Sequence, residues 1–484
     1  MVRGRSRTQA VHDKEQQING GPTSSPMNRA KKAVIIDRGN TSHIETAVEA
    51  DNMSINDEKE NGQVVVPVKN GSIQRKIDEA HHPEKKRDTG PKGMCYITEE
   101  SLTDWQREKI KELRQRLGEE LLAETPIFND QFSLLRWLMG WNYKIEEILP
   151  RFEKTSRILK CMKCSDLVFD NVDDLNRYCS TLTLACEYFP GGVMSLDDDG
   201  NVVTLQALGK SQPKSLSRCG RVSDVYRLCI VETSLIYQLI KVQEKKHKKK
   251  LGLRVIIDLE GFNTDHMGTS ALKVYANFLR QLQYMFPDLC RRVYVINAPT
   301  MVAAAYKLIK GVLSEQSREK VVFLSSSYQE TLISDIGASN LLTRWGGSFD
   351  PPHGNKQTGF LRMGGHPPES LRYAPEKNPH HVDEDKLTKL YVPARGRKEI
   401  EVGVAKPGDV VHWYFYTNGD IEFGEDQEDR LEIWPHFRLT TDWIPEFGHV
   451  ECKTTGLHRV VFDNSFSMFF SKEIRYHVYI KSKD

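Results

Sequence analysis

The sequence lacks the features that would assign it to several common classes of protein. It contains no run of about 18 apolar residues, so no segment is long enough to cross a bilayer as a helix. No glycine-rich loop follows a predicted strand, which argues against a phosphate cradle for a nucleotide. The 68 basic residues nearly balance the 66 acidic ones, and a net charge of +2 gives no global field that would attract nucleic acid.

Signatures of catalysis and of metal binding are missing as well. The chain has no G-x-S-x-G elbow, no H-E-x-x-H motif and no Walker lysine loop. Cys161 and Cys164 form the only C-x-x-C pair, without a second pair at zinc-finger spacing. His266 stands alone in a loop, and we expect His380 and His381 to be solvated in a linker. We therefore expect no enzymatic activity, no cofactor and no metal site.

Cysteine use and the first part of the chain favour a cytoplasmic protein with a disordered tail. Nine cysteines are an odd number, and the N-terminus carries no apolar signal segment, so reduced thiols are expected. Residues 1–95 are rich in charged and small polar residues, and the first Phe, Tyr or Trp of the chain is Tyr96. Such a segment cannot bury enough apolar surface to offset its chain entropy, so we expect it to be disordered.

Three short β-branched runs in the middle of the chain predict a parallel sheet. They are LRVIIDLEG (253–261), RRVYVINAP (291–299) and EKVVFL (319–324). Buried parallel strands have continuous apolar runs, and amphipathic stretches of helical period separate these three. The region therefore predicts a β-α-β-α-β unit. A further strand is expected over 205–208, after a turn at 196–201.

Segments of helical period precede this unit. Residues 104–122 and two helices within 132–160 predict a helical cap. A long helix is expected over about 223–246, and a group of lysines lies at its end: Lys245, Lys246, Lys248, Lys249 and Lys250. Near an anionic leaflet each lysine could contribute about 1 kcal/mol, so the group is a candidate membrane patch. The alternative is a solvated helix end.

The C-terminal region follows a different period. Residues 390–482 alternate with a period of two, which predicts an antiparallel β-sandwich of about eight strands. A Pro- and Gly-rich linker at 353–380 separates it from the sheet. Trp413 and Phe415 share one face of a strand, while the tyrosines between and after them share the other. At least one of these faces must therefore be covered.

Short motifs occur in an order and spacing that point to one family. They are LLRWL (134–138), IIDLEG (256–261), FPD (286–288), INAP (296–299), YKLIKGVLSEQSREK (306–320), RWGG (344–347), GDVVHWYFYTNGDIEFG (408–424) and HRVVFDNSFSMFFSKEI (458–474). Together they resemble the CRAL-TRIO lipid-binding family followed by a GOLD domain. The resemblance implies an α/β CRAL-TRIO domain with a mixed, largely parallel sheet, a helical gate and an N-terminal helical cap, and then an all-β GOLD sandwich. The divisions expected are a tail at 1–95, the helical region at 96–170, the lipid-binding domain at 171–352, the linker at 353–380 and the GOLD domain at 381–482.

The resemblance implies that one lipid lies between the sheet and a mobile helical gate at 301–313. The apolar side chains of this gate are Val302, Ala305, Tyr306, Ile309 and Leu313. An ordinary crossover helix with one buried stripe is the alternative. Each buried CH₂ is worth about 0.8 kcal/mol, so a diacyl lipid cannot pass freely through water. We therefore expect the gate to meet the bilayer directly.

The resemblance also implies a headgroup site. By position, Lys320, Ser317 and Asp288 correspond to the residues around the phosphate in phosphatidylinositol-binding members, with Asp in place of Glu. An ammonium and a hydroxyl can both donate to a phosphodiester, and the carboxylate would orient the lysine and keep it charged. The alternative is a surface Lys–Asp pair of little energetic value.

One departure from the family leaves the ligand open. The turn after LLRWL usually carries further arginines in this family, whereas this chain has Met139 and Trp141 there. Only Arg136 remains as a basic residue of that helix. This departure favours a less charged ligand, such as phosphatidylcholine, a tocopherol or a retinoid, over phosphatidylinositol.

The sequence thus predicts a cytoplasmic, peripherally membrane-associated protein that binds or transfers lipid. Its expected partners are a phospholipid or other hydrophobic small molecule, a membrane surface and a trafficking protein bound through the GOLD domain, with no nucleic acid. In the alternative, the protein is a trafficking adaptor whose GOLD domain binds a protein partner and whose pocket only senses lipid. A lipid-modifying enzyme would need a nucleophile and a base in the pocket, and the sequence shows neither.

Overall fold

The computed structural model describes residues 34–36, 96–169, 171–427 and 432–482. Apart from Val34–Ile36, the predicted tail lies outside the described residues. Those three residues form strand β1, which pairs antiparallel with β8 of the C-terminal domain. This strand lies in the segment predicted to be disordered, although Val-Ile-Ile is a run of β-branched residues. Among the described residues, no helix is both long and apolar enough to cross a membrane.

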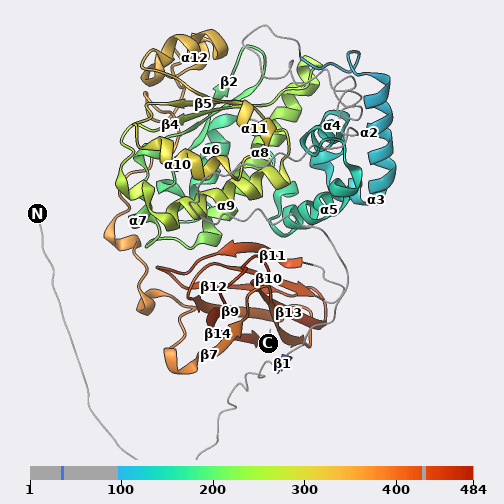
Figure 1. Cartoon of the computed structure of the whole chain (residues 1–484), viewed down its shortest axis with the longest axis vertical. Helices are drawn as coiled ribbons and strands as arrows, with labels where there is room; N and C mark the ends of the chain where they lie inside the picture. The colour runs from blue at the N-terminus through green and yellow to red at the C-terminus, as the bar shows by residue number, and fades with distance from the viewer. Residues whose placement is uncertain (1–33, 37–95, 170, 428–431, 483–484) are drawn as a thin grey trace, which may run out of the picture.

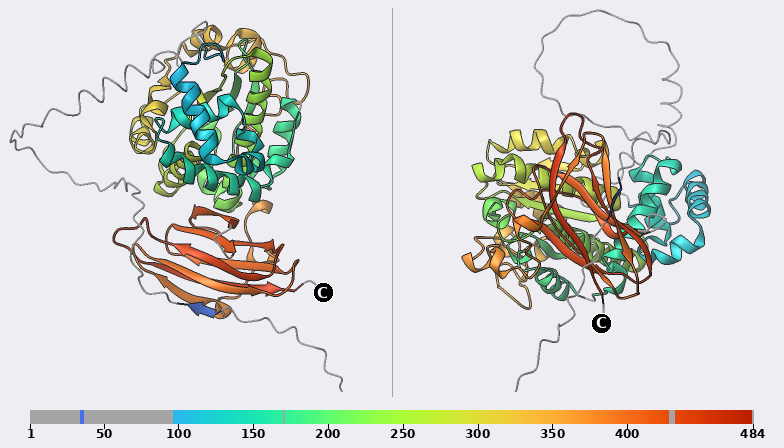
Figure 2. Two further views of the ribbon diagram at one scale, coloured as in Figure 1. Left: turned by 90° about the vertical axis from the view of Figure 1, so that its right-hand side faces the viewer. Right: turned by 90° about the horizontal axis from the view of Figure 1, so that it is seen from below.

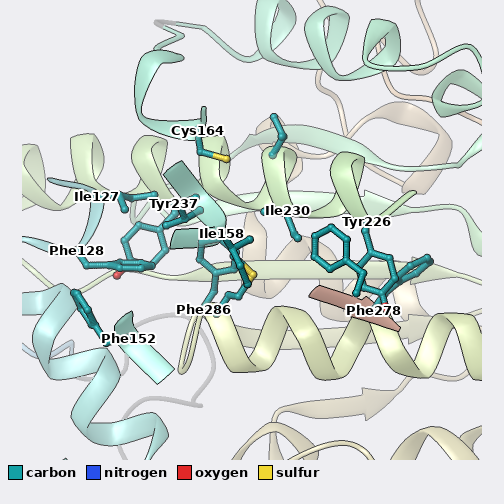
Figure 3. Packing of buried hydrophobic residues seen from close by; sticks show 14 of the residues in the cluster. Ile127, Phe128, Phe152, Ile158, Cys164, Tyr226, Ile230, Tyr237, Phe278 and Phe286 are labelled. Carbon is teal, nitrogen blue, oxygen red and sulfur yellow. The ribbon is translucent and has the colours of Figure 1, made fainter. Parts of the chain in front are cut away.

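The N-terminal helical cap is confirmed and packs beside the central sheet (Figure 1). Its helices are α2 (Asp104–Leu117), α3 (Glu119–Glu124), α4 (Gln131–Gly140) and α5 (Ile145–Cys161). The segment predicted as one helix over 104–122 is divided at Gly118, which has a φ of 79° and ends α2. Aromatic side chains join this cap to the rest of the domain: Phe128 meets Tyr237 at 5.2 Å and Phe286 at 6.1 Å between ring centroids (Figure 3).

A five-stranded sheet in the order β2-β3-β4-β5-β6 forms the centre of the larger domain. The strands are β2 (Gly192–Leu196), β3 (Val202–Gln206), β4 (Leu253–Asp258), β5 (Cys290–Ile296) and β6 (Val321–Phe323). The pair β2–β3 is antiparallel, and β3 to β6 are parallel, as the three apolar runs predicted. The strand expected over 205–208 lies earlier, because β3 begins at Val202, opposite Leu253 of β4.

The two faces of this sheet are covered by different helices. One face packs closely against α12 (Tyr328–Ile336) and the buried Trp345. The other face lies beneath α8 (Val222–His247), α9 (Thr269–Met285), α10 (Val302–Lys310) and α11 (Glu315–Glu319). Helix α8 confirms the long helix predicted over 223–246. A short helix, α6 (Val172–Thr181), packs beside β2 and α8.

The C-terminal β-sandwich is confirmed, and Figure 2 shows it below the helical domain. One sheet has the order β1-β8-β13-β10-β11 and the other the order β12-β9-β14-β7, and all pairs are antiparallel. The strands are β7 (Thr388–Val392), β8 (Arg397–Val404), β9 (Val410–Thr417), β10 (Ile421–Gln427), β11 (Glu432–Leu439), β12 (Glu446–Glu451), β13 (Gly456–Asp463) and β14 (Lys472–Lys481).

Both faces of β9 are covered. Trp413 and Phe415 are buried between the two sheets. Tyr414, on the other face, is buried beneath the linker, where its hydroxyl lies 3.3 Å from that of Tyr373 and 3.1 Å from Nδ1 of His381. The expectation that both linker histidines are solvated holds for His381, which is exposed, but not for His380, which is half-buried because the linker folds back over the outer face of the sandwich.

The sandwich contacts the first turn of α8. The ring of Tyr226 stacks on that of Phe437 with centroids 4.6 Å apart, and Ser223 donates to the Glu446 carboxylate at 2.9 Å. Arg221 donates to the carbonyl oxygen of Phe447. These contacts set the sandwich against the end of the helical layer that covers the sheet.

Candidate ligand-binding site

A cavity of about 900 Å³ lies between the sheet and the helices α8, α9 and α10. Small-molecule sites usually measure roughly 300–1,000 Å³, so this cavity is at the large end of that range. Side chains alternate along a strand, so every second residue of β4, β5 and β6 faces it. The floor consists of Val255, Ile257, Val293, Val295, Val321 and Phe323. These side chains are all apolar.

The five residues predicted for the gate all line this cavity. Val302, Ala305, Tyr306 and Ile309 recur at helical spacing along one side of α10. Leu313 lies beyond the helix, contrary to the predicted range of 301–313. The helix is shorter because Gly311 is its C-terminal cap and Ser314 starts the next helix by accepting a hydrogen bond from the Ser317 amide.

The outer side of α10 combines exposed apolar and basic side chains. Met301 is 40% exposed and Leu308 is 38% exposed. Lys307 and Lys310 are exposed on the same short helix. The helix therefore presents one apolar side to the cavity and a mixed apolar and cationic side to the surroundings.

Three charged side chains meet at the end of the cavity where α9 stops. The Lys320 ammonium lies 2.6 Å from one carboxylate oxygen of Asp288, and the Lys250 ammonium lies 2.9 Å from the other. All three side chains are buried. Lys320, Asp288 and Ser317 line the cavity. The alternative of an exposed Lys–Asp pair is wrong, because these side chains are buried. Removing one partner of a buried pair typically costs about 3–5 kcal/mol.

The charge of this group favours an anion. Burial by itself would raise the pKa of Asp288, but Lys250 and Lys320 together hold it well below its usual range. The group contains two ammonium groups and one carboxylate. The chain approaches closely here, because a side chain at Gly140 would collide with Pro287, which precedes Asp288. The end of α4 therefore packs directly against this charged corner.

The predicted basic patch is only partly present. Lys245, Lys246 and Lys248 are exposed, whereas Lys250 is buried against Asp288 and Lys249 pairs with Asp199 at 2.9 Å. The chain leaves the helix at Lys248, which has a φ of 57°, and turns inward to the sheet. Inclusion of Lys249 and Lys250 in a surface patch was wrong for this reason.

Arg136 is not available to a ligand. Its side chain is fully buried, where it pairs with Glu244 and donates to the carbonyl oxygen of Leu251. Trp141 does line the cavity, and the Arg151 guanidinium lies 4.1 Å from the centre of its ring. The region after LLRWL thus offers an aromatic surface to the cavity, in place of the arginines usual in the family.

The opposite end of the cavity is formed partly by the β-sandwich. The segment between β11 and β12 contributes Thr440, Asp442, Trp443 and Ile444 to the cavity wall. Ser270, in the first turn of α9, donates to the Asp442 carboxylate at 2.9 Å. Helix α9 has 17 residues, so the sandwich end and the charged end are separated by roughly 25 Å.

Sequence reasoning missed this contribution from the sandwich, because the contacting residues lie 172 positions apart. His266 also lines this end of the cavity. It is a buried residue that accepts a hydrogen bond from the Asn263 amide at 3.1 Å, and burial lowers its pKa. A neutral imidazole in this position adds no charge, but Lys214 and Asp265, which pair at 2.7 Å, also line the cavity.

Two of the family motifs meet at a buried carboxylate. Asp258, in the IIDLEG motif, accepts hydrogen bonds from Asn297 at 2.8 Å and from the Trp345 indole at 3.0 Å. Asn297 belongs to INAP and Trp345 to RWGG. The motifs that supported the resemblance therefore hold the ends of β4 and β5 together.

Comparisons with known proteins agree with this architecture. Residues 187–347 match the family described as CRAL/TRIO domain. The chain is 23% identical over 397 residues to "Protein ctg-1" of Caenorhabditis elegans, an alignment that covers 79% of this chain and 98% of that protein. It is 27% identical over 233 residues to "Sec14 cytosolic factor" of Schizosaccharomyces pombe, covering 46% of this chain and 77% of that protein.

Among solved structures, "Crystal structure of Sfh5" matches with a TM-score of 0.35 and 15% identity, over 46% of this chain and 81% of that one. This similarity is too low to support an argument. The family match and the curated relatives are sufficient for the domain: residues 187–347 are a CRAL-TRIO domain, and the β-sandwich that follows is consistent with a GOLD-like domain.

Proposed function

We propose that this protein holds one phospholipid or similar hydrophobic molecule in the cavity and exchanges it at membrane surfaces. The observation that carries the proposal is a largely apolar cavity of about 900 Å³ with buried lysines at one end, built mainly by a CRAL-TRIO domain. Such a shape suits a molecule with a long apolar part and a polar or anionic head. Proteins of this family are in general lipid transporters rather than enzymes.

The gate in this proposal is the segment from Met301 to Leu313. Its inner side chains line the cavity, and the exposed Met301 and Leu308 with the neighbouring lysines suit the interface of a bilayer. Outward movement of α10 at the membrane would expose the cavity to lipid without passing acyl chains through water. Each buried CH₂ is worth about 0.8 kcal/mol, so direct contact with the bilayer avoids a large barrier.

In the same proposal, Lys320 and Ser317 donate to a phosphate group, and Asp288 orients Lys320. A matched pair of variants tests this role. Lys320→Ala and Lys250→Met each remove one ammonium from Asp288, but Lys320 lines the cavity and Lys250 is not among the lining residues. We expect Lys320→Ala to slow phosphatidylinositol transfer between vesicles at least about 10-fold, since a charged hydrogen bond is worth about 1.5–3 kcal/mol.

Lys250→Met should retain most of the phosphatidylinositol transfer, and both variants should transfer phosphatidylcholine at close to the wild-type rate. Equal loss of both lipids in Lys320→Ala would show that the residue is needed for the domain as a whole and would refute the headgroup role. Equal loss of phosphatidylinositol transfer in both variants would show that only the total charge matters.

Native mass spectrometry of the purified full chain tests the broader proposal. A bound lipid that leaves on incubation with acceptor vesicles is the expected result. A protein that stays empty when offered phosphatidylinositol, phosphatidylcholine and tocopherol would favour the trafficking adaptor, in which the GOLD-like domain supplies the function.

A further inference from the structure

Three histidines from distant parts of the chain meet on the outer face of the β-sandwich. His412 of β9 and His449 of β12 are directly paired across two antiparallel strands. His380 comes from the linker that lies over them. One ring nitrogen of each histidine lies within 4.8 Å of a ring nitrogen of the other two. The ring centroids are 5.2 Å apart for His412 and His449, and 5.5 Å apart for His380 and His449.

Neighbouring aromatic rings hold these histidines in place. The ring of His412 lies parallel to that of Tyr479 on β14, with centroids 4.8 Å apart. The ring of His380 stacks on Phe447, and its backbone amide donates to the Asn378 side chain at 3.0 Å. Two of the three imidazoles therefore have ring contacts outside the cluster.

The cluster contains a nitrogen that needs a partner. The Nδ1 atom of His412 is buried and has no hydrogen-bond partner among the described residues. Leaving a buried polar atom unsatisfied typically costs about 1–3 kcal/mol. A cation coordinated by the imidazole nitrogens would remove this cost if Nδ1 is the donor.

The protonation state also suits a metal ligand. Burial, the neighbouring histidines and Lys481 together lower the pKa of His412 to about 4. The pKa of His380 is lowered by burial and by His449 and Arg221. Metals bind neutral imidazole, and a low pKa removes competition from protons at pH 7. Lys481 and Arg221 also repel an added cation. The affinity for a metal ion must therefore come from its bonds to the imidazole nitrogens.

We propose that His380, His412 and His449 bind one divalent transition-metal cation, Zn²⁺ in particular. Imidazole ligands suit Zn²⁺, Cu²⁺ and Ni²⁺, and three histidines with one open position form a recognised zinc arrangement. Zn–N bonds of about 2.0–2.1 Å place tetrahedral ligand nitrogens about 3.4 Å apart. The imidazoles must therefore approach one another by roughly 1 Å, which rotation of the side chains and movement of the linker can provide. A water would complete the coordination.

Such a site would fasten the linker to the sandwich near the contact between the two domains. Strand β12 carries His449 and also Glu446 and Phe447, which contact the start of α8. His380 belongs to the segment that joins the domains in sequence. A cation shared by these residues would hold the linker, β9 and β12 together, and would thereby stabilise the position of the sandwich at the end of the cavity.

Titration of the chelator-treated full chain with Zn²⁺, in competition with a chromophoric chelator, tests the site. We expect one tight equivalent in the wild type, and at least about 10-fold weaker binding in His412→Gln and in His449→Gln. The matched control is His381→Gln, which removes the adjacent histidine of the linker, whose ring contacts Tyr414 instead. Co²⁺ in place of Zn²⁺ should give the absorption bands of a four-coordinate site in the wild type and in the control only.

Limited proteolysis supplies a second readout. Lys377 is exposed three residues before His380, so trypsin can report on the linker. Zn²⁺ should slow cleavage after Lys377 several-fold in the wild type and not in His449→Gln. His449 is exposed on the edge strand β12, so this variant is expected to fold even if His412→Gln does not. Equal Zn²⁺ affinity in the wild type and in the folded His449→Gln variant would overturn the proposal.

Discussion

The two sheet-containing regions of this molecule differ in how completely side chains fill the space against their sheets. The β-sandwich fills the space between its sheets with large rings: Phe415 lies 4.7 Å from Phe423 and 5.0 Å from Phe462 between centroids. The sheet of the CRAL-TRIO domain is filled on one face only. Ile256 packs with Trp345 on that face, whereas Ile257, the next residue, lines the cavity.

The difference lies in side-chain size and in what holds the covering layer. Four of the six residues of the cavity floor are valine, and these short side chains fill less space than the rings of the sandwich, although Val295 packs with Val302 of α10. Helix α9 is held at a distance by contacts at its ends and sides, such as Phe278 with Tyr226 at 4.6 Å. The cavity therefore remains open between the small side chains of the sheet and helices that are held in place by contacts with other elements.

Truncation in the filled sandwich should be most costly. Phe415→Ala removes a ring that is fully buried between Phe423 and Phe462, and should lower the free energy of unfolding by about 3–5 kcal/mol. Chemical denaturation of the full chain measures this change. Phe415→Leu is the control and should lose clearly less. A loss below about 1 kcal/mol for the alanine variant would mean that the sandwich is not closely packed at this point.

The folding stability of the protein should depend on pH through Glu446, which lies at the contact between the sandwich and α8. Burial raises the pKa of Glu446 from 4.5 to about 7, although Arg221 acts in the opposite direction. Because the pKa is higher in the folded state, the protonated form of Glu446 stabilises that state, and this contribution is complete below about pH 4.5. That contribution is lost as the pH rises to about 7, and amounts to about 3 kcal/mol at most.

The Glu446→Gln variant, which cannot ionise, tests this dependence. Asp224 and Arg221 are the other charged groups that act on Glu446, and both remain in the variant. Unfolding at pH 5 and at pH 8 should show a decline in stability for the wild type that is smaller in the variant. An identical decline in both proteins would assign the pH dependence to other groups.

Adjacent isoleucines on β4 give the most direct comparison of the packed and the hollow face. Ile256→Ala should cost about 3 kcal/mol, because it leaves a cavity in a closely packed cluster. Ile257→Ala should cost only about 1 kcal/mol, because its side chain already borders a cavity. Denaturation curves of both variants in lipid-free protein measure the difference. Equal costs would indicate that the cavity is filled or collapses in solution.

The smallest effect on stability is expected at Trp443, which is 49% exposed and lines the cavity end formed by the sandwich. Trp443→Ala should change the free energy of unfolding by less than about 1 kcal/mol. It should nevertheless shorten the retention of a bound lipid several-fold in a dilution assay with acceptor vesicles. Phe469→Ala, which removes a ring that is 78% exposed and not among the lining residues, should leave retention unchanged.

Local pattern was sufficient to predict much of the fold and part of the site. The apolar runs gave β4, β5 and β6, helical period gave α8, and alternation gave the strands of the sandwich. The residues of the gate were predicted from the family resemblance, and all of them line the cavity. Their role in exchanging lipid stays a prediction, as does the role of Lys320 and Ser317 at a headgroup.

Residues whose partners lie far away in the sequence were misplaced or missed. Lys250 was assigned to the surface because four other lysines surround it, yet its partner is Asp288 on a different element. Arg136 was considered for a ligand, yet Glu244 neutralises it inside the domain. Neither partner has a signature in the local sequence, since charge pairing across a fold depends on distances that only folding creates.

The sequence by itself determined which segments become strands and helices, because period and side-chain type act between near neighbours. It also determined that small β-branched residues would line one face of the central sheet. Only the tertiary structure decided that this face is hollow, that Trp443 of the sandwich closes one end and that Lys250 joins Lys320 at the other. The reason is that a cavity is bounded by surfaces from many segments, and their separation is set by contacts that lie outside the cavity itself.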